Sequence, residues 1–334
     1  MKILGIESSC DETASSVVSF DGENYKVLSN IVNSQIDLHK KYGGVVPEVA
    51  SRAHIENIEY VVDEALKDNE DIDAVAVTAT PGLLGALLVG VNYAKGFAYS
   101  RELPLIAVNH IEGHISSLLL EHKFNEPIIV LVASGGHCLV YKVDSNFSSF
   151  ELLAKSRDDA PGEAFDKIAR LLDLGYPGGP VIEKLASEYD GEDIYKFPQV
   201  KIQNTDDFSF SGVKTAVINA VHKAEQKGDD IDKKAVCFSF QEAVANVLAE
   251  RTVSIALKQN VHNIAIVGGV SANSYIKNKM QELAEQNNLN FYSPDKKHSG
   301  DNAAMIAVRG IKMYQEKKVA DLSLDAVASL KLKG

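Results

Sequence analysis

The sequence predicts an α/β fold made of two related halves. Along the 334 residues, short apolar runs that are typical of buried strands alternate with longer segments of helical periodicity. A strand–turn–strand pattern also occurs twice, once at the N-terminus and again from residue 127. Two copies of one pattern, each followed by further strands and helices, indicate an internal duplication.

In the first half, the apolar run KILGIE predicts a buried strand, and the polar turn SSCDET separates it from a partner strand. Further along, Ile55 and Ile58 are expected to share the apolar face of a helix that begins at His54. The expected strands are residues 2–7, 14–20, 25–32, 74–78 and 105–108, and the expected helices lie at 54–66, after Pro81 and from near His110.

The second half opens with the apolar run PIIVLVA, the glycine turn SGGHC and a returning strand. Late in the chain, the strand IAIV leads into GGVSAN and a helix. The expected strands of this half are residues 127–133, 139–143 and 264–267. The expected boundaries are 1–109 for the first half, 110–125 for a connecting helix, 126–334 for the second half, and about 163–258 for a mostly helical insert.

The composition limits the classes of function. The chain is 45% hydrophobic and 24% charged, without low-complexity tracts, which is typical of a folded globular protein. Its formal net charge of -12 argues against a protein that binds nucleic acid alone by neutralising phosphates. If the substrate is RNA, a local basic patch or other subunits must supply the positive surface.

The cysteines and the N-terminus indicate a cytoplasmic protein. Cys10, Cys138 and Cys237 are widely spaced, and no pair has the spacing of a metal or redox motif. Acidic residues follow the N-terminal apolar run at once, so we expect no signal peptide. The most apolar segment, residues 82–99, contains four glycines and Lys95, which predicts a buried helix and no membrane span.

Three turns follow buried strands and contain residues that can face a phosphate. They are the acidic turn ESSCDET at residues 7–13, whose carboxylates can orient a metal, a water or a nucleophile, the glycine turn SGGH at residues 134–137, and GGVSAN at residues 268–273. Glycines let a backbone approach a ligand, and the amides of a helix N-terminus attract anions. Taken alone, the acidic turn is better explained as an ordinary polar hairpin turn, SGGH is also typical of a hairpin turn, and each of the three is a weak signal. The three together predict a nucleotide bound in a cleft between the halves.

A possible metal site is the pair His110 and His114, which lie four residues apart in the segment HIEGH. On a helix, this spacing places both imidazoles on one face, about 6 Å apart. The zinc-protease motif needs Glu directly after the first histidine, and Ile111 stands there. Asp301 is a candidate third ligand, although it can equally be the N-cap of the following helix. His137 is a further candidate.

The motifs as a set resemble one protein family. In order along the chain, they are IESSCDETA, YGGVVPEVASRAH, TATPGLLGALLVG, NHIEGH, VASGGH, PGEAFDK, YPGGP, FSFSGVKTA, GGVSAN and SGDNAAMIA. The sequence from Met1 to about Ile311 resembles the transferase subunit of the bacterial tRNA threonylcarbamoyladenosine machinery. Members of this family were once called O-sialoglycoprotein endopeptidases.

This resemblance implies a fold and a reaction. The implied fold is the duplicated actin-like ATPase fold shared by actin, Hsp70 and sugar kinases, with two α/β domains and a cleft. The implied enzyme is an acyltransferase that moves the threonylcarbamoyl group from threonylcarbamoyl-AMP to N6 of adenosine 37. Its substrates are tRNAs that read ANN codons, and AMP is released. Binding of ATP, ADP or AMP is also implied.

The resemblance also implies site residues and partners. His110, His114 and Asp301 are expected to hold one iron (Fe2+) or zinc ion, and Asp11 and Glu12 match family acids near the phosphate side. The expected substrate-binding residues are Val132, Ala133, Ser134, Gly135, Gly136, Asp166, Gly179, Glu183, where the family often has Asp, and Asn273. The expected partners are tRNA, a shorter actin-like paralogue and a P-loop ATPase, with no membrane.

Three other functions stay open at this point. The chain can be a small-molecule kinase or ATPase of the same fold, a metalloprotease, or a partner subunit that has lost its chemistry. Ile111 argues against the protease, and the presence of His110, His114 and Asp301 argues against an inactive subunit.

Overall fold

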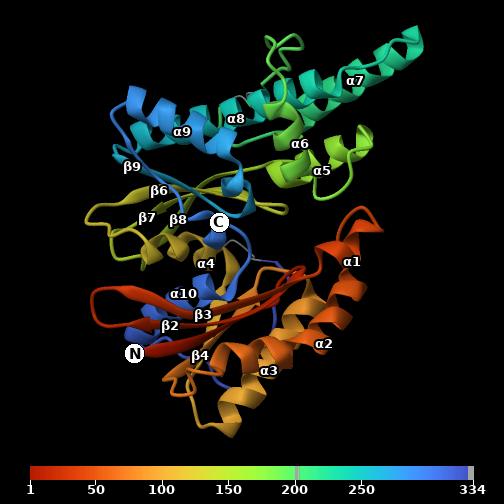
Figure 1. The fold of residues 1–334 in the computed structure, drawn as a ribbon. Coiled ribbons are helices and arrows are strands. Elements are labelled where there is room, and N and C mark those ends of the chain that lie inside the picture. Colours follow the sequence, from red (N-terminus) through yellow and green to blue (C-terminus); the bar gives the residue numbers. More distant parts are fainter. Residues whose placement is uncertain (200–201, 203, 330–334) are drawn as a thin grey trace. The chain divides into compact units, whose positions relative to one another are not determined.

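The computed structural model describes residues 1–199, 202 and 204–329. The chain forms two compact units, and each has its own sheet (Figure 1). The first unit is Met1–Lys123 together with the C-terminal segment from Gly300, and the second is Phe124–Ser299. This division differs from the expected one, which assigned all of residues 126–334 to the second half. The C-terminal helix packs on the first sheet instead.

The sheet of the first unit has five strands in the described residues, in the order β3-β2-β1-β4-β5. Strands β1, β2 and β3 are antiparallel neighbours, whereas β1, β4 and β5 run parallel. The strands are β1 (Lys2–Glu7), β2 (Glu12–Phe20), β3 (Tyr25–Ser34), β4 (Ala74–Thr80) and β5 (Leu105–Asn109). Each expected strand of the first half is therefore present, within a few residues.

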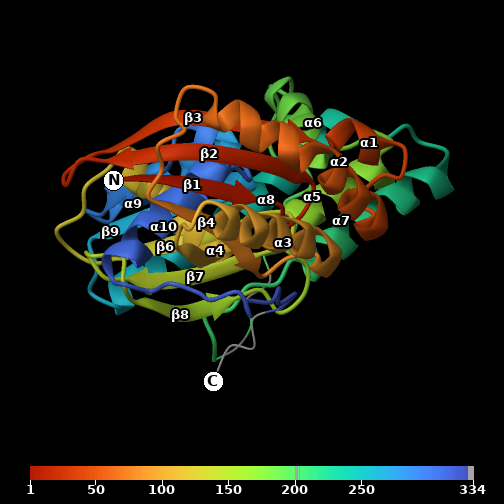
Figure 2. The same cartoon turned by 90° about the horizontal axis from the view of Figure 1, so that it is seen from below.

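Helices cover both faces of this sheet (Figure 2). They are α1 (Ile36–Lys40), α2 (Pro47–Leu66), α3 (Leu84–Ser100), α4 (His110–Ser116), the short 3-10 helix η1 (Ser117–Leu120) and α10 (Ala303–Gln315). Leu4 and Ile6 of β1 pack in the core that α2 and α3 form, whereas Ile3 packs in the core that α10 forms. The alternation arises because successive strand residues point to opposite faces.

One expected helix differs from the structure at its N-terminus. Helix α2 begins at Pro47, seven residues before the expected start. Proline favours the first helical turn because its missing N–H has no intrahelical partner there. The expectation that Ile55 belongs to the apolar face was wrong, since Ile55 is 65% exposed, whereas Ile58 is 5% exposed.

The second unit repeats the strand order of the first. Its sheet is β10-β9-β6-β7-β8, with β6, β7 and β8 antiparallel and β6, β9 and β10 parallel. The strands are β6 (Ile128–Ala133), β7 (Cys138–Val143), β8 (Phe150–Lys155), β9 (Asn263–Val267) and β10 (Asn290–Tyr292). Read from the opposite edge, β8-β7-β6-β9-β10 corresponds strand for strand to β3-β2-β1-β4-β5. This correspondence confirms the predicted duplicated α/β fold.

The helices of the second unit follow β8 and the late strands. They are α5 (Pro161–Leu171), α6 (Gly178–Ser187), α7 (Ser211–Lys227), α8 (Lys233–Lys258), η2 (Gly269–Ala272), α9 (Ser274–Gln286) and η3 (Lys296–His298). Helices α5 to α8 occupy most of the stretch expected to be helical. Buried side chains from α5, α8 and β6, among them Phe165, Phe240 and Leu131, belong to one hydrophobic core.

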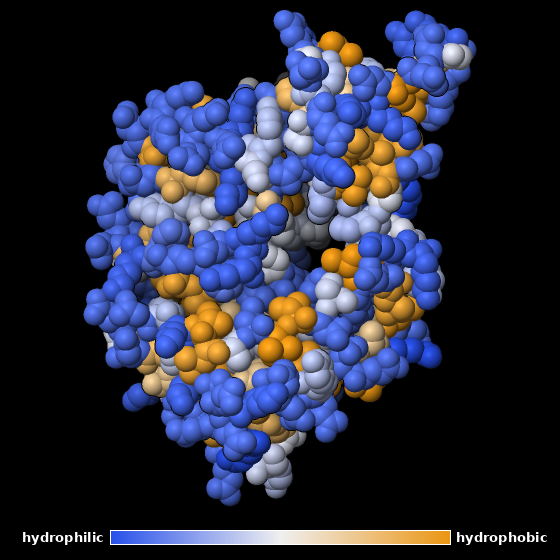
Figure 3. Space-filling model, in the orientation of Figure 1, coloured by the Kyte–Doolittle hydropathy of each residue, from blue (hydrophilic) through white to orange (hydrophobic). Residues whose placement is uncertain are grey.

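The surface agrees with the composition of a folded globular protein. Figure 3 shows a face on which hydrophilic residues predominate and hydrophobic ones are scattered. Among the described helices, none combines the length and the hydrophobicity that a bilayer crossing requires.

Candidate functional site

The candidate metal centre begins at the junction of β5 and α4. Asn109 ends the strand, and its Oδ1 accepts hydrogen bonds from the backbone N–H of Ile111 at 2.8 Å and of Glu112 at 3.4 Å. This cap starts the helix at His110, as the sequence predicted. His110 and His114 are 5% and 1% exposed, and their ring centroids lie 4.6 Å apart.

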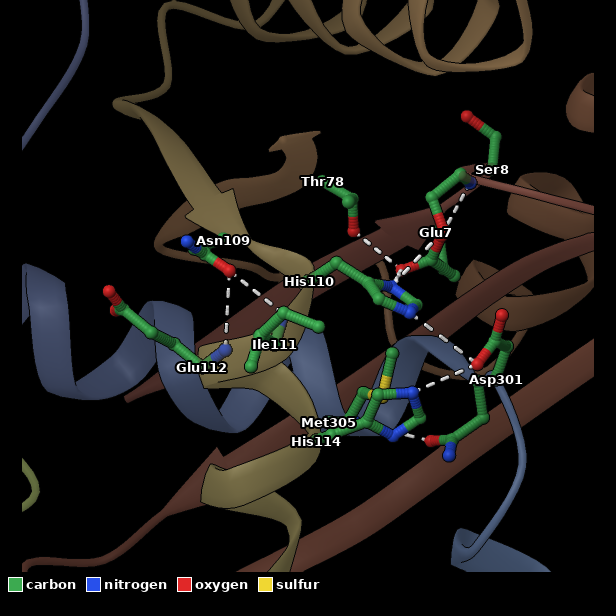
Figure 4. Close-up of polar contacts among 12 residues, drawn as sticks. Glu7, Ser8, Thr78, Asn109, His110, Ile111, Glu112, His114, Asp301 and Met305 are labelled. Atoms are coloured by element: carbon green, nitrogen blue, oxygen red, sulfur yellow. Dashed lines mark hydrogen bonds and ion pairs between the residues drawn. The ribbon is translucent and has the colours of Figure 1, made fainter. Parts of the chain in front are cut away.

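Asp301 approaches both histidines from the loop before α10 (Figure 4). Its Oδ1 lies 3.0 Å from His114 Nε2 and 3.6 Å from His110 Nε2. One ligand atom from each of the three residues lies within 4.8 Å of the other two. The alternative that Asp301 is the N-cap was wrong, because Asn302 holds that position and accepts from Met305 N–H at 3.2 Å.

These three residues fit a metal ion. Within the described part of the chain, Nε2 of His114 is buried and makes no hydrogen bond, although Asp301 is close. His114 Nε2 and Asp301 Oδ1 are therefore close enough for a hydrogen bond, but their angles do not allow one. A buried nitrogen without a hydrogen bond destabilises the folded protein. Two imidazoles and a carboxylate are the donor set of catalytic zinc sites and of non-haem iron sites.

The electrostatics of the cluster favour positive charge. Burial lowers the pKa of His110, but the carboxylates of Asp301 and Glu7 raise it more, to about 9. Burial raises the pKa of Glu7, whereas the charge and hydrogen bond of His110 lower it, and the pKa lies below its usual value. Two carboxylates thus surround one imidazole, and a cation there gains from both.

A partly buried ion pair links α4 to α10. Arg309, which is 3% exposed, donates from Nε to Glu112 Oε2 at 2.7 Å. Gly113 lies against the same helix, since a Cβ there would come within 2.8 Å of Ile306 Cδ1. These contacts hold the helix with both histidines against the helix that follows Asp301.

The acidic turn between β1 and β2 holds the candidate catalytic carboxylates. Glu12 is the first residue of β2, and its Oε1 accepts from Ser34 Oγ at 3.1 Å. Burial raises the pKa of Glu12 well above its usual value, and the nearby negative charges of Asp11 and Asp301 raise it further. Asp11, Glu12 and the metal cluster therefore share one region of negative potential.

In the second unit, the expected glycine turn connects β6 to β7. The Ser134 N–H donates to the carbonyl of His137 at 2.9 Å, and the His137 N–H donates to Ser134 Oγ at 3.1 Å. Gly135 and Gly136 are exposed, and a Cβ at either would meet nothing within 4 Å. The turn is therefore accessible, whereas Val132 and Ala133 are fully buried in β6.

The GGVSAN turn lies directly against this region. Gly268 has a φ of 89°, and a Cβ there would lie 2.5 Å from the carbonyl oxygen of Ala133. Glycine is required for both reasons. The turn ends at Asn273, whose Oδ1 accepts from Ile276 N–H at 3.0 Å and whose Nδ2 donates to Gln241 at 2.9 Å. Asn273 is thus the N-cap of α9, and its side chain is already oriented by the protein.

Asp166, Gly179 and Glu183 surround the N-termini of α6 and α9. Asp166 Oδ1 accepts from the backbone N–H of Gly178, the first residue of α6, at 2.7 Å. Glu183 Oε1 accepts from the N–H of Ser274, the first residue of α9, at 2.7 Å. At Gly179 a Cβ would meet nothing within 4 Å. The longer side chain of Glu183 therefore has a definite role in capping α9.

Some residues of the site were not predicted from the sequence. Thr78 contacts Glu7 and was assigned no role, and Glu7, a member of the acidic turn, was not expected to contact His110. Their common signal is position: Glu7, Thr78 and Asn109 all lie at or near the carboxyl ends of β1, β4 and β5, which are parallel neighbours. Ligand sites in such sheets collect at that edge.

Comparisons with known proteins agree with these features. The family model TsaD, described as tRNA N6-adenosine threonylcarbamoyltransferase, matches residues 26–308. The protein of that name from Caldicellulosiruptor saccharolyticus is 48% identical over 337 residues, which cover 99% of this chain and 98% of that protein. The one from Clostridium perfringens is 50% identical over 336 residues, with the same two coverages.

Solved structures share the fold at low identity. Full-length HypF in its phosphate- and nucleotide-bound form superposes with a TM-score of 0.61 at 16% identity, over 98% of this chain and 47% of that one. The activator of 2-hydroxyisocaproyl-CoA dehydratase from Clostridium difficile, with bound ADPNP, gives 0.53 at 16% identity, over 96% and 99%. These matches concern the fold alone. The match to the family model and the near-full-length relatives show that this chain belongs to the tRNA N6-adenosine threonylcarbamoyltransferase family.

Proposed function

We propose that this chain transfers the threonylcarbamoyl group from threonylcarbamoyl-AMP to N6 of adenosine 37 in tRNAs that read ANN codons. The observation that carries the proposal is the convergence of His110, His114 and Asp301 within 4.8 Å in a member of this family. In the reaction, the N6 amine attacks the carbamoyl carbon, the bond from that carbon to the phosphate oxygen breaks, and AMP leaves. The amine gives up one proton.

We propose that the three residues hold one Fe2+ or Zn2+ ion. The ion would supply Lewis acidity toward an oxygen of the mixed anhydride. The protein's own contribution is to keep both imidazoles and the carboxylate fixed before the substrate arrives, through the Asn109 cap and the Arg309 ion pair. Fixed donors need no reorganisation when charge develops in the transition state.

We place the adenylate at the turns of the second unit. The exposed backbone at Gly135 and Gly136 and the uncrowded position of Gly179 in the first turn of α6 suit a phosphate or a sugar hydroxyl. The side chains of Asp166 and Glu183 orient the backbone around this surface. Val132 and Ala133 are buried, so any contact they make with the adenylate is through the backbone. Asn273 keeps the α9 N-terminus in place.

Asp11 and Glu12 are the proposed catalytic carboxylates. Either side chain can take up the proton that N6 releases, and the raised pKa of Glu12 makes its carboxylate a stronger base. A poor amine nucleophile gains most from alignment, so we expect their effect to be smaller than that of the metal ligands.

The acidic chain is proposed to act in the cytoplasm with basic surfaces on other subunits. The proposed partners are a shorter paralogue of the same fold and a P-loop ATPase. Helix α3 is a candidate surface for the paralogue, because Leu84 at its start is 49% exposed. Leu88 is partly buried in the core of the first unit, so only Leu84→Asp tests docking cleanly. An intact heterodimer in that variant would remove α3 from the proposal.

A transfer assay tests the proposed function. Metal-loaded protein, threonylcarbamoyl-AMP, unmodified tRNA and the two proposed partners should yield modified adenosine and AMP in equal amounts. His114→Ala should lower the rate by at least about 100-fold, as expected for loss of a metal ligand. His222→Ala, on the exposed face of α7, is the matched control and should keep the wild-type rate. A wild-type rate in His114→Ala would contradict the proposal, and ATP turnover without tRNA would favour a kinase or ATPase.

A further inference from the structure

Glu7 is a buried carboxylate behind the metal cluster. It is the last residue of β1 and is 0% exposed. Its Oε1 accepts from the backbone N–H of Ser9 at 2.5 Å, and its Oε2 accepts from Thr78 Oγ1 at 2.6 Å. The same Oε2 lies 3.0 Å from Nδ1 of His110. A buried carboxylate is costly unless donors surround it, and here three donors do.

These contacts determine which nitrogen of His110 faces the cluster. Because a carboxylate only accepts hydrogen bonds, the proton of His110 lies on Nδ1 toward Glu7. Nε2 is then the atom directed at Asp301, 3.6 Å away (Figure 4). Ser9 Oγ, 3.1 Å from the same Nδ1, adds a second acceptor on that side. The ring has one orientation and keeps a proton on Nδ1 toward Glu7, so the neutral ring that binds a metal coordinates it through Nε2.

We propose that Glu7 is a positioning residue of the metal centre, held by Thr78, which orients His110 with Nε2 toward the ion and makes the imidazole a stronger donor. This inference rests on the proposed metal site. Carboxylates in this position behind a ligating histidine typically contribute 10–100-fold to metal affinity. Thr78 is one step further from the cluster and acts through its hydrogen bond to the Glu7 carboxylate, so its contribution should be smaller.

A purely structural role for Glu7 gives a different expectation. The carboxylate also joins β1 to β4 through Thr78, and losing that link would destabilise the first unit with or without a metal. A positioning role changes metal affinity and the ligand field in protein that is still folded. Measurement of the metal equilibrium on folded, metal-free protein therefore separates the two roles.

The experiment is a titration of metal-free protein with Co2+ and Zn2+ against a chromophoric chelator. Glu7→Gln should raise the Kd by about 10–100-fold and alter the visible absorption spectrum of bound Co2+. The matched control is Glu242→Gln in α8 of the second unit, where a half-buried carboxylate bonds Lys279 and Tyr275. It should bind both ions as the wild type does.

Two further variants make every result interpretable. Thr78→Val keeps the side-chain shape and should raise the Kd several-fold, whereas Thr252→Val, a buried threonine bonded to the Leu248 carbonyl in α8, should not. If Glu7→Gln does not fold, Thr78→Val decides the matter. Wild-type Kd and Co2+ spectrum in the folded variants would overturn the role of Glu7. If His114→Ala also keeps its metal, the proposed metal site itself fails.

Discussion

Adding one methyl group at Gly5 should disturb the metal centre without touching a ligand. A Cβ at Gly5 of β1 would lie 2.3 Å from the Ala303 carbonyl oxygen and 2.8 Å from the Ala307 nitrogen, both in the backbone of α10. An ordinary contact begins at 3.4 Å, so α10 must move by about 1 Å. Overpacking of this kind costs about 1–3 kcal/mol of unfolding free energy.

The same shift should weaken metal binding. Asp301 lies two residues before Ala303, and metal–ligand distances tolerate errors of only about 0.2 Å. We therefore expect Gly5→Ala to raise the Kd for Zn2+ by about tenfold or more, as for other displaced supporting groups. The assays are urea unfolding of metal-free protein and chelator-competition titration.

A matched glycine in α3 provides the control. A Cβ at Gly96 would meet nothing within 4 Å, so Gly96→Ala should stabilise the helix by about 0.5–1 kcal/mol and leave the Kd unchanged. Wild-type stability and wild-type Kd in Gly5→Ala would show that α10 does not pack this closely on β1. The proposed coupling between the sheet and Asp301 would then be wrong.

Three smaller predictions concern the supports of the site. Asn109→Ala removes the cap of α4 and should cost about 1 kcal/mol in urea unfolding, and a cost near zero would contradict the capping role. Arg309→Met leaves the partly buried Glu112 carboxylate without this partner and should cost about 1–3 kcal/mol in urea unfolding. A double-mutant cycle with Glu112→Gln should show a coupling energy of about 1–3 kcal/mol, and additive losses would mean that the pair does not interact. Burial holds the pKa of His54 below its usual value of 6.5, so the unfolded chain binds more protons than the folded one in the window below 6.5. The free energy of unfolding should therefore fall as the pH drops through about 6.5. Unfolding curves at pH 7.5 and 5.5 should show a smaller loss of stability in His54→Asn than in the wild type. An equal loss in the two proteins would contradict the role of His54.

The central strands were predictable because a strand buried on both faces is a continuous run of mostly apolar residues. KILGIE and PIIVLVA are continuous apolar runs, and both fold as central strands of their sheets. Strands β8 and β10 were missed for the opposite reason, since β8 contains exposed Glu151 and Lys155 and β10 has only three residues. Both are edge strands, which need less apolar sequence.

The return of α10 to the first unit was not predictable from local pattern. Helix α10 is buried along most of its length, which the sequence shows, but nothing local says which sheet it covers. The deciding contact is the close approach of Gly5 and Ala303, residues far apart in the chain. Residues 126–334 were assigned to one half because they follow one another in the chain. In the structure, the chain returns to the first unit at Gly300.

The residues of the candidate site also fall into those that local sequence predicted and those that depend on the tertiary structure. The spacing of His110 and His114 predicted a shared helical face, and the structure has it. Asp301 came from the family resemblance, because the spacing argument could not tell a ligand from an N-cap. The contact between Glu7 and Thr78 could be predicted only from the strand order β1-β4-β5, which brings together side chains 71 residues apart in the chain. Pairings across parallel strands leave no local signal.

One titration joins the metal site to the reaction. Metal-free protein, supplied with threonylcarbamoyl-AMP, unmodified tRNA and the proposed partners, is given Fe2+ or Zn2+ stepwise while modified adenosine is counted. We predict that the rate rises in proportion to added metal, stops at one ion per chain, and stays at background in His114→Ala. A full rate in the metal-free protein, or a rate in His114→Ala that follows the wild type, would show that these residues do not form the centre on which transfer depends.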